Sequence, residues 1–175
     1  MNFKVKKAAV LGSGVMGSGI ACHLANVGID VLMLDIQPKD KSKKNRNIVA
    51  DDALNNAIKS KPNPLYKKEY ASRITTGNFD DDFEKIKDAD WIIEVVVENL
   101  KIKKTIFEKV EKYKSDGAFV TSNTSSIPIS LLCEGRSDSF KSLFCGTHFF
   151  NPPRYLRLFE VIPQTKTDPK LVSFL

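Results

Sequence analysis

A glycine-rich loop near the N-terminus constrains the fold more than any other feature of the sequence. The segment KKAAVLGSGVMGSGIA places Gly12, Gly14 and Gly17 in a G-x-G-x-x-G pattern, directly after a short apolar run. A second apolar run, IDVLMLD, ends on Asp35, which lies 18 residues after Gly17. A strand, such a loop, a helix and a second strand that ends on an acid together indicate a dinucleotide-binding α/β domain.

Each residue of this loop is expected to have a separate physical role. Gly12 allows a tight turn, Gly14 allows a pyrophosphate to approach the backbone, and Gly17 allows the helix to pack closely on the strand. The free N–H groups at the helix N-terminus, where Val15 and Met16 lie, would then bind the pyrophosphate, and the helix dipole also favours an anion there. The alternative interpretation is a glycine-rich turn that binds no ligand.

Asp35 predicts which dinucleotide is bound. A carboxylate at the end of the second strand can accept hydrogen bonds from both ribose hydroxyls of NAD. It would repel the 2′-phosphate of NADP by roughly 4 kcal/mol per charge, at about 4 Å and an effective dielectric constant near 20. Solvent lowers this energy, and the neighbouring Lys39 could offset part of it. The sequence therefore favours NAD.

Short apolar runs alternate with helical patterns through the rest of the chain. Helices are predicted over residues 16–28, 43–61, 81–90, 101–114 and 127–135, with a further short helix before the strand RITTG. Strands of four to seven apolar residues lie between them. This alternation indicates a Rossmann-like, mostly parallel sheet with helices on both faces and a helical hairpin inserted after the second strand.

The net charge of +6 lies entirely in residues 39–73, which contain ten Lys or Arg and four Asp or Glu. One interpretation is a solvated, lysine-rich helical surface. The other is an electrostatic binding surface for a polyanion. Nucleic acid fits this surface poorly, because only Tyr66 and Tyr70 offer rings on which bases could stack.

Composition excludes several other classes of protein. The sequence has no run of about 18 apolar residues, and its N-terminus lacks the apolar length of a signal peptide. Cys22, Cys133 and Cys145 are widely spaced and form no C-x-x-C pattern. They are predicted to be reduced, mostly buried thiols of a cytoplasmic protein, with neither a metal site nor disulfides.

His148 is the strongest candidate for a reacting group. It ends the apolar run SLFCGTHFF, and Glu160 follows 12 positions later in the strand-like segment LFEVI. Ligands of open α/β sheets bind at the carboxyl ends of the strands. Transfer of a hydride from an alcohol to NAD needs a group that takes the hydroxyl proton, and histidine does this near neutral pH. A carboxylate partner orients such an imidazole and stabilises its cation. The NPPR turn could bring the two strands side by side.

The alternative is that His148 is a core histidine satisfied by a backbone carbonyl. The other histidine, His23, lies in the middle of the helix behind the glycine loop and is predicted to be structural.

LGSGVMGSGIA, EVVVENLKIK, SNTSSIPI and GTHFFNPP, followed by LFEVI, resemble the NAD-binding domain of the 3-hydroxyacyl-CoA dehydrogenases of fatty-acid β-oxidation. The resemblance covers about residues 6–170. It implies NAD-dependent oxidation of (S)-3-hydroxyacyl-CoA to 3-oxoacyl-CoA, with His148 and Glu160 as the catalytic pair.

The same resemblance implies roles for four more residues. Ser125 would bind the oxygen of the substrate near the nicotinamide, with Asn151 close by. Glu98 and Lys103 would line the nicotinamide-ribose end of the cofactor site.

The resemblance also implies that residues 39–73 correspond to the helical hairpin on which these enzymes bind the phosphates of coenzyme A. Lys59 and Lys61 are the candidate contacts, although the hairpin sequence matches only in general character.

The resemblance also implies a domain organisation. Residues 1–167 would form the NAD-binding domain, and residues 168–175 would begin an all-helical domain that supplies dimer contacts and closes the acyl site. These 175 residues alone would then be poorly active. The PPRYLRLFE and KPNP segments resemble long bacterial members that continue into a hydratase-type domain.

Two alternatives to this enzyme stay open. Another β-hydroxy acid dehydrogenase on the same sheet would need a catalytic lysine in the helix after the sheet, and the sequence does not make one evident. A domain that binds NAD for regulation, without catalysis, is the second alternative.

Overall fold

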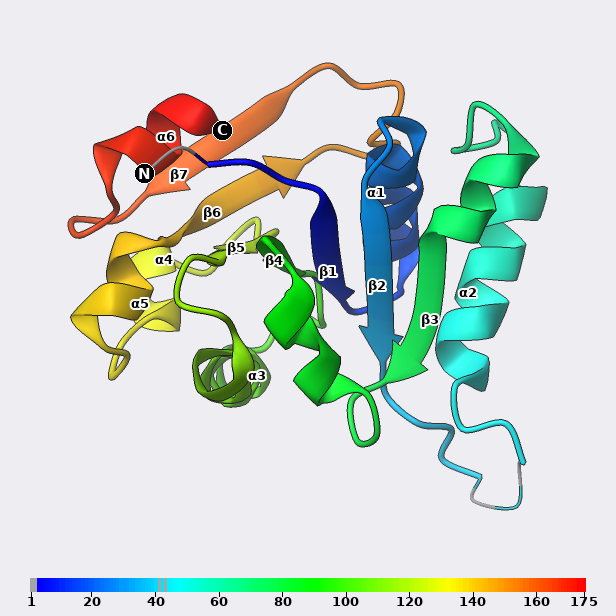
Figure 1. Cartoon of the computed structure of the whole chain (residues 1–175), viewed down its shortest axis with the longest axis horizontal. Coiled ribbons are helices and arrows are strands. Elements are labelled where there is room, and N and C mark those ends of the chain that lie inside the picture. The colour runs from blue at the N-terminus through cyan, green and yellow to red at the C-terminus, as the bar shows by residue number, and fades with distance from the viewer. Residues whose placement is uncertain (1–2, 41, 43) are drawn as a thin grey trace.

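The computed structural model describes residues 3–40, 42 and 44–175. Within these residues the chain forms a seven-stranded sheet in the order β3-β2-β1-β4-β5-β6-β7 (Figure 1). Neighbouring strands are parallel, except that β7 runs antiparallel to β6. The strands are β1 (Lys7–Leu11), β2 (Asp30–Asp35), β3 (Ile74–Asn78), β4 (Trp91–Glu94), β5 (Phe119–Ser122), β6 (Phe144–Phe149) and β7 (Phe159–Pro163). This arrangement confirms the predicted Rossmann-like fold.

Helices cover both faces of the sheet. The α-helices are α1 (Val15–Asn26), α2 (Ile48–Lys59), α3 (Leu100–Tyr113), α4 (Ile129–Leu132), α5 (Asp138–Ser142) and α6 (Pro169–Phe174), and the 3₁₀ helices are η1 (Lys68–Arg73) and η2 (Phe83–Asp88). Because side chains alternate along a strand, Ala8 and Val10 of β1 pack in one core cluster with α1 and α2. Ala9 and Leu11 pack in a second cluster with α3, α4 and η2.

The strand order places the ligand-binding edge of the sheet. From β1 the chain builds one half of the sheet, β2 and then β3. It then returns to the middle, where β4 pairs with β1 on the side opposite to β2, and it builds the other half from there. In open α/β sheets, ligands bind at the carboxyl ends of the strands at such a point. The glycine loop follows β1 at this edge, and Glu94 ends β4 beside it.

The insertion between β2 and β3 contains the two predicted helical segments, but their extent and type differ from the prediction. Its first arm is α2, which begins at Ile48 rather than at Lys43, and Lys43 itself lies outside the described residues. The second arm contains no α-helix: residues 60–67 have none, and η1 is a single 3₁₀ segment. Pro62 and Pro64 explain this, because proline lacks an N–H donor and disfavours helical geometry in the residue before it.

Helix α3 carries a charged residue into the interior. The Asn99 side chain caps the helix by accepting a hydrogen bond from the N–H of Ile102 at 3.1 Å. The buried face of α3 has the spacing of an amphipathic helix, and its members are Lys103, Ile106, Phe107 and Val110. A lysine therefore occupies a core position at the end of the helix that lies nearest the sheet edge.

Helix α6 packs against this same domain. Asp168 caps it, Pro169 is its first residue, and the Leu171 side chain is fully buried in the first core cluster. The ring of Phe174 lies 5.4 Å from that of Phe3, measured between centroids. The domain boundary that the sequence places after residue 167 stays a prediction.

The cysteines agree with the sequence-based expectation. Cys22, Cys133 and Cys145 are free and buried. Burial raises the pKa of both Cys22 and Cys145 to about 12, so these two thiols stay protonated near neutral pH. Over the described ranges, no helix is long and apolar enough to cross a bilayer, and no cluster of His, Cys, Asp and Glu side chains is arranged to bind a metal ion.

Candidate active site

The three glycines of the loop lie in different environments. Gly12 has a φ of +109°, and a Cβ there would lie 2.6 Å from the carbonyl oxygen of Val95. A Cβ on Gly17 would lie 1.8 Å from the carbonyl oxygen of Gly12. Gly14, at the start of α1, is different, since a Cβ there would meet nothing within 4 Å. The two crowded glycines shape the turn, and the open one leaves room for a pyrophosphate on the N-terminus of α1.

Asp35 is held at the edge of this loop. Its Oδ2 accepts hydrogen bonds from the backbone N–H and the hydroxyl of Ser13, both at 2.6 Å, and its Oδ1 accepts from the N–H of Ile36 at 2.7 Å. The carboxylate stays partly exposed, and each of its oxygens can accept more than one hydrogen bond. Ribose hydroxyls can therefore bind to it as the sequence predicts. The role of Ser13 was not predicted, although its place between the first two glycines could have suggested it.

The orientation of Asp35 leads to a prediction on cofactor choice. The protein is expected to bind NADH more tightly than NADPH, because the fixed carboxylate repels a 2′-phosphate. In Asp35→Asn the preference should narrow by about fivefold, the equivalent of about 1 kcal/mol for a partly exposed pair of charges. Calorimetric titration with both cofactors measures the ratio. Asp30→Asn, at the other end of β2, is the matched control. Equal dissociation constants of the native protein for the two cofactors would contradict the role of Asp35.

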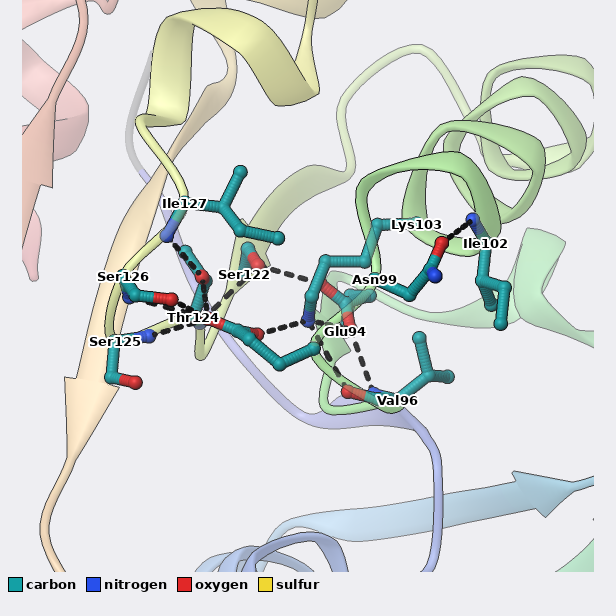
Figure 2. Close-up of polar contacts among 11 residues, drawn as sticks. Glu94, Val96, Asn99, Ile102, Lys103, Ser122, Thr124, Ser125, Ser126 and Ile127 are labelled. Atoms are coloured by element: carbon teal, nitrogen blue, oxygen red, sulfur yellow. Dashed lines mark hydrogen bonds and ion pairs between the residues drawn. The ribbon is translucent and has the colours of Figure 1, made fainter.

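A buried ion pair lies where β4, β5 and α3 meet (Figure 2). The Lys103 Nζ atom is 2.7 Å from Glu94 Oε1, and the two side chains are 1% and 0% exposed. The Ser122 hydroxyl donates to Glu94 Oε2 at 2.5 Å, and the N–H of Val96 donates to Oε1 at 2.7 Å. Burial raises the pKa of Glu94, and the ammonium group of Lys103 opposes this rise. The pair fixes the ends of two strands against α3.

Glu98 connects this pair to the loop SNTSS. Its Oε2 lies 3.1 Å from Lys103 Nζ. Its Oε1 accepts hydrogen bonds from the hydroxyls of Thr124 and Ser126 and from the backbone N–H groups of Ser125 and Ser126. Burial alone would raise the pKa of Glu98, but the hydrogen bonds from Thr124 and Lys103 outweigh it and lower the pKa to about 2. One carboxylate therefore holds the backbone of the loop that contains Ser125.

The structure separates the roles of Glu98 and Lys103. The Glu98 side chain is 37% exposed, whereas that of Lys103 is 1% exposed. The Lys103 side chain is therefore shielded from solvent, and Glu98 is the more exposed of the two carboxylates that it contacts. Glu94 was missed, although an acid at the end of the apolar strand WIIE could have indicated a buried partner.

The depressed pKa of Glu98 predicts a pH dependence of stability. Its pKa falls from 4.5 in the unfolded chain to about 2 in the folded one. The carboxylate therefore stabilises the fold fully above pH 4.5, and this contribution is lost as the pH falls toward about 2. In Glu98→Gln the free energy of unfolding should fall less than in the native protein between pH 5 and pH 3. Urea unfolding at both pH values measures the difference. The exposed Glu84→Gln is the control, and identical pH profiles for Glu98→Gln and the native protein would refute the assignment.

His148 and Glu160 face each other across the last two strands. They are directly opposite residues in the antiparallel pairing of β6 and β7, and His148 Nδ1 lies 2.8 Å from Glu160 Oε2. The ring of Phe150 lies 4.4 Å from the imidazole, measured between centroids. In the described part of the chain, His148 Nε2 has no hydrogen-bond partner. The predicted side-by-side placement of the two strands is confirmed.

His23 lies in a different environment from His148. Its Nδ1 atom is buried, and the described residues provide no hydrogen-bond partner for it. Its ring packs edge-on against Phe149, at 6.3 Å between centroids. Burial lowers the pKa of His23, so the ring stays neutral. These contacts support the structural role that the sequence predicts.

A cavity of about 470 Å³ joins the glycine loop to the turn that follows β6. Val15 at the start of α1, Lys61 after α2 and Asn151 after β6 all line it. Of the two predicted lysines, only Lys61 reaches the cavity, since Lys59 is exposed at the end of α2 and is not among the lining residues. The cavity thus brings Val15, a candidate for cofactor binding, together with Lys61 and Asn151, two candidates for substrate binding.

Most of the other candidates do not line this cavity, among them His148, Glu160, Asp35, Glu98, Met16 and Ser125. Met16 is partly buried, and its side chain packs against the first core cluster. Ser125 is exposed on the loop that Glu98 holds and does not line the cavity.

Comparison with known proteins identifies the family. Residues 7–175 match the family model described as "3-hydroxyacyl-CoA dehydrogenase, NAD binding domain". A relative from Bacillus subtilis named "Probable 3-hydroxyacyl-CoA dehydrogenase" is 52% identical, over 100% of this chain and 24% of its own length. One of the same name from Deinococcus radiodurans is 50% identical, over 97% of this chain and 49% of its own length. The chain thus spans between about a quarter and half of these relatives.

The structural comparison agrees with the sequence comparison. The crystal structure of 3-hydroxybutyryl-CoA dehydrogenase from Escherichia coli matches with a TM-score of 0.76 and 26% identity, over 98% of this chain and 35% of that protein. The matched family is defined as NAD-binding, and the glycine loop and Asp35 fit a dinucleotide, so NAD is the cofactor. The chain belongs to the family of NAD-binding domains of the 3-hydroxyacyl-CoA dehydrogenases.

Proposed function

We propose that this chain supplies the cofactor site and the acid–base pair of an enzyme that oxidises (S)-3-hydroxyacyl-CoA to 3-oxoacyl-CoA with NAD, as in fatty-acid β-oxidation. The observation that carries this proposal is the contact of 2.8 Å between His148 and Glu160, on the same sheet as a glycine loop shaped for a dinucleotide. The names of the relatives support the substrate class. Three free, buried cysteines support a reducing, cytoplasmic location.

The hydrogen bonding of the pair determines which nitrogen of His148 reacts. An ionised Glu160 can only accept a hydrogen bond, so the hydrogen of the neutral imidazole lies on Nδ1. Nε2 then carries a free lone pair and takes the proton of the 3-hydroxyl group. Glu160 keeps the ring in this orientation and stabilises the imidazolium that forms. The bound nicotinamide supplies the hydride acceptor.

Ser125 and Asn151 are proposed to position the reacting oxygen of the substrate. The backbone of Ser125 is fixed by Glu98, and the described part of the chain leaves its hydroxyl without a hydrogen-bond partner. Asn151 lies two residues after the end of β6 and lines the cavity. Fixed donors of this kind stabilise a developing alkoxide without reorganisation during the reaction.

The cavity suggests a route for the coenzyme A ester. Its lining is formed largely by small, apolar and proline side chains, which suit the uncharged pantetheine arm. Lys61 lies at its rim on the basic segment 39–73, where the phosphates of coenzyme A can bind. We propose that the nucleotide binds on this segment while the acyl end reaches His148.

This route predicts that acetoacetyl-CoA binds more weakly as salt is added. Lys61→Glu should raise the dissociation constant by about fivefold, whereas Lys59→Glu, at the last residue of α2 and off the cavity, should raise it less. Titration calorimetry at two salt concentrations measures both effects, and Lys101→Glu on α3 is the control. If an acetoacetyl-pantetheine ester bound as tightly as the full CoA ester, the basic segment would have no role in binding the nucleotide.

Absorbance at 340 nm tests the proposed function. The enzyme is expected to oxidise NADH in the presence of acetoacetyl-CoA and to leave acetoacetate, which lacks coenzyme A, nearly untouched. A regulatory domain would bind NADH without turnover, and a dehydrogenase of free β-hydroxy acids would turn over acetoacetate. Either of these results would contradict the proposal.

A further inference from the structure

Arg154, in the turn between β6 and β7, forms hydrogen bonds with the segment that follows α2. Arg154 Nη1 donates hydrogen bonds to the carbonyl oxygen of Asn63 at 2.5 Å and to that of Leu65 at 2.9 Å. The hydroxyl of Tyr155 also donates to the carbonyl oxygen of Asn63, at 3.2 Å. These residues are about 90 positions apart in the sequence, and no strand or helix pairing joins the two segments.

The guanidinium group of Arg154 is also stacked on aromatic rings. Its central carbon lies 4.4 Å from the ring centroid of Tyr66 and 4.9 Å from that of Tyr155. A planar guanidinium can stack on rings while its edge donates hydrogen bonds to two carbonyl groups. The compact ammonium group of a lysine cannot reproduce both contacts. The site therefore needs arginine and not only a positive charge.

The segment that receives Arg154 is held by side chains rather than by secondary structure. The Asn63 side chain accepts from the N–H of Leu65 at 2.8 Å. Asn26, at the end of α1, donates to the carbonyl oxygen of Pro64 and accepts from the N–H of Tyr66, both at 2.8 Å. Asn26 thus fixes one side of the segment to α1, and Arg154 fixes the other side to the β6–β7 turn.

The turn itself packs on α1. A Cβ on Gly19 would lie 3.1 Å from Pro153, so the absence of a side chain at Gly19 lets the turn approach the helix closely. The start of α1, the segment after α2 and the turn together enclose the cavity of about 470 Å³, and Arg154 is one of its lining residues. The width of the cavity therefore depends on the contact between Arg154 and the segment after α2.

We propose that Arg154 is a positioning residue that sets the shape of this cavity and so aligns an acyl-CoA with His148. The part that concerns the substrate rests on the proposed function. Arg154 lies three residues after Asn151, and a turn released from residues 63–65 would shift Asn151 and the cavity together. The glycine loop and Asp35 are held by other contacts, so the binding of NADH should not change.

The test compares Arg154→Gln and Arg154→Lys with Arg157→Gln, which changes an exposed arginine of the same turn. Both substitutions of Arg154 should raise the KM for acetoacetyl-CoA by about tenfold, since small displacements of a bound substrate are costly. The dissociation constant of NADH should stay within about twofold, and the Arg157 variant should behave as the native enzyme. Full rescue by lysine, or an unchanged KM in Arg154→Gln, would overturn the proposal.

Hydrogen exchange tests the same inference without any enzymatic activity. In Arg154→Gln and Arg154→Lys, the amides of Leu65 and Tyr66 should exchange faster than in the native protein, while those of β1 and β4 should not change. Unchanged exchange at residues 65 and 66 would overturn the inference. An enzyme that binds NADH but does not reduce acetoacetyl-CoA would refute the proposed function, and the exchange result would still decide the role of Arg154.

Discussion

Replacement of His148 by glutamine is expected to lower turnover by at least about 10²-fold, the low end for loss of a general acid–base group. An amide can form hydrogen bonds, but it cannot accept and return a proton near neutral pH. The affinity for NADH should stay unchanged, because the glycine loop and Asp35 lie on other strands. Steady-state rates from absorbance at 340 nm and NADH titrations measure the two quantities.

The control for this substitution is His23→Gln, at the partly buried histidine that packs on Phe149. It should leave turnover nearly unchanged in the molecules that fold. Normal activity in His148→Gln would make His148 a structural histidine and would contradict the proposed acid–base role.

Glu160→Gln should also be slow, for a reason that the geometry supplies. A neutral amide cannot stabilise the imidazolium, and its NH₂ group can donate to His148 Nδ1. That hydrogen bond favours the tautomer with its hydrogen on Nε2, where the substrate proton must be accepted. A turnover equal to that of the native enzyme would show that the contact of 2.8 Å has no catalytic role.

Replacement of Lys103 by methionine should cause the largest loss of stability among these variants. Removal of one partner from a buried ion pair costs about 3–5 kcal/mol, because the other charge stays buried without compensation. Here Glu94 is 0% exposed, and Lys103 is 1% exposed. Urea unfolding measures the loss, and Lys101→Met, an exposed change on the same helix, is the control.

A double variant separates the ion pair from packing. Glu94→Gln combined with Lys103→Met should recover part of the stability, because it removes the uncompensated charge. Lowering the pH should also recover part of the stability of Lys103→Met. Burial raises the pKa of Glu94, and a protonated carboxyl group costs less to bury than a charged one. A single variant no less stable than the Lys101→Met control would contradict the importance of the pair.

The parts of the fold that the sequence predicted correctly are those encoded by local patterns. The strand, glycine loop and helix around Gly12 follow from spacing within about 30 residues, and so does the strand that ends on Asp35. The pairing of His148 with Glu160 could be anticipated, because a short turn separates two apolar strand segments.

The features that the sequence did not predict depend on contacts between distant residues. Arg154 and Asn63 are 91 positions apart, and nothing near either residue indicates the other. The short helix predicted before the strand RITTG is present, but as the 3₁₀ helix η1 and not as an α-helix. The burial of Lys103 was visible in principle, because it shares the spacing of the buried positions of α3.

The central claim is that the glycine loop, the cavity and the His148–Glu160 pair form one active site. A crystal structure of the enzyme with NAD and acetoacetyl-CoA tests it most directly. The 3-keto oxygen is expected to lie about 2.6–3.2 Å from His148 Nε2, with the pantetheine arm in the cavity lined by Asn151 and Lys61. A complex in which NAD occupies the glycine loop while the ketone lies away from His148 would contradict it.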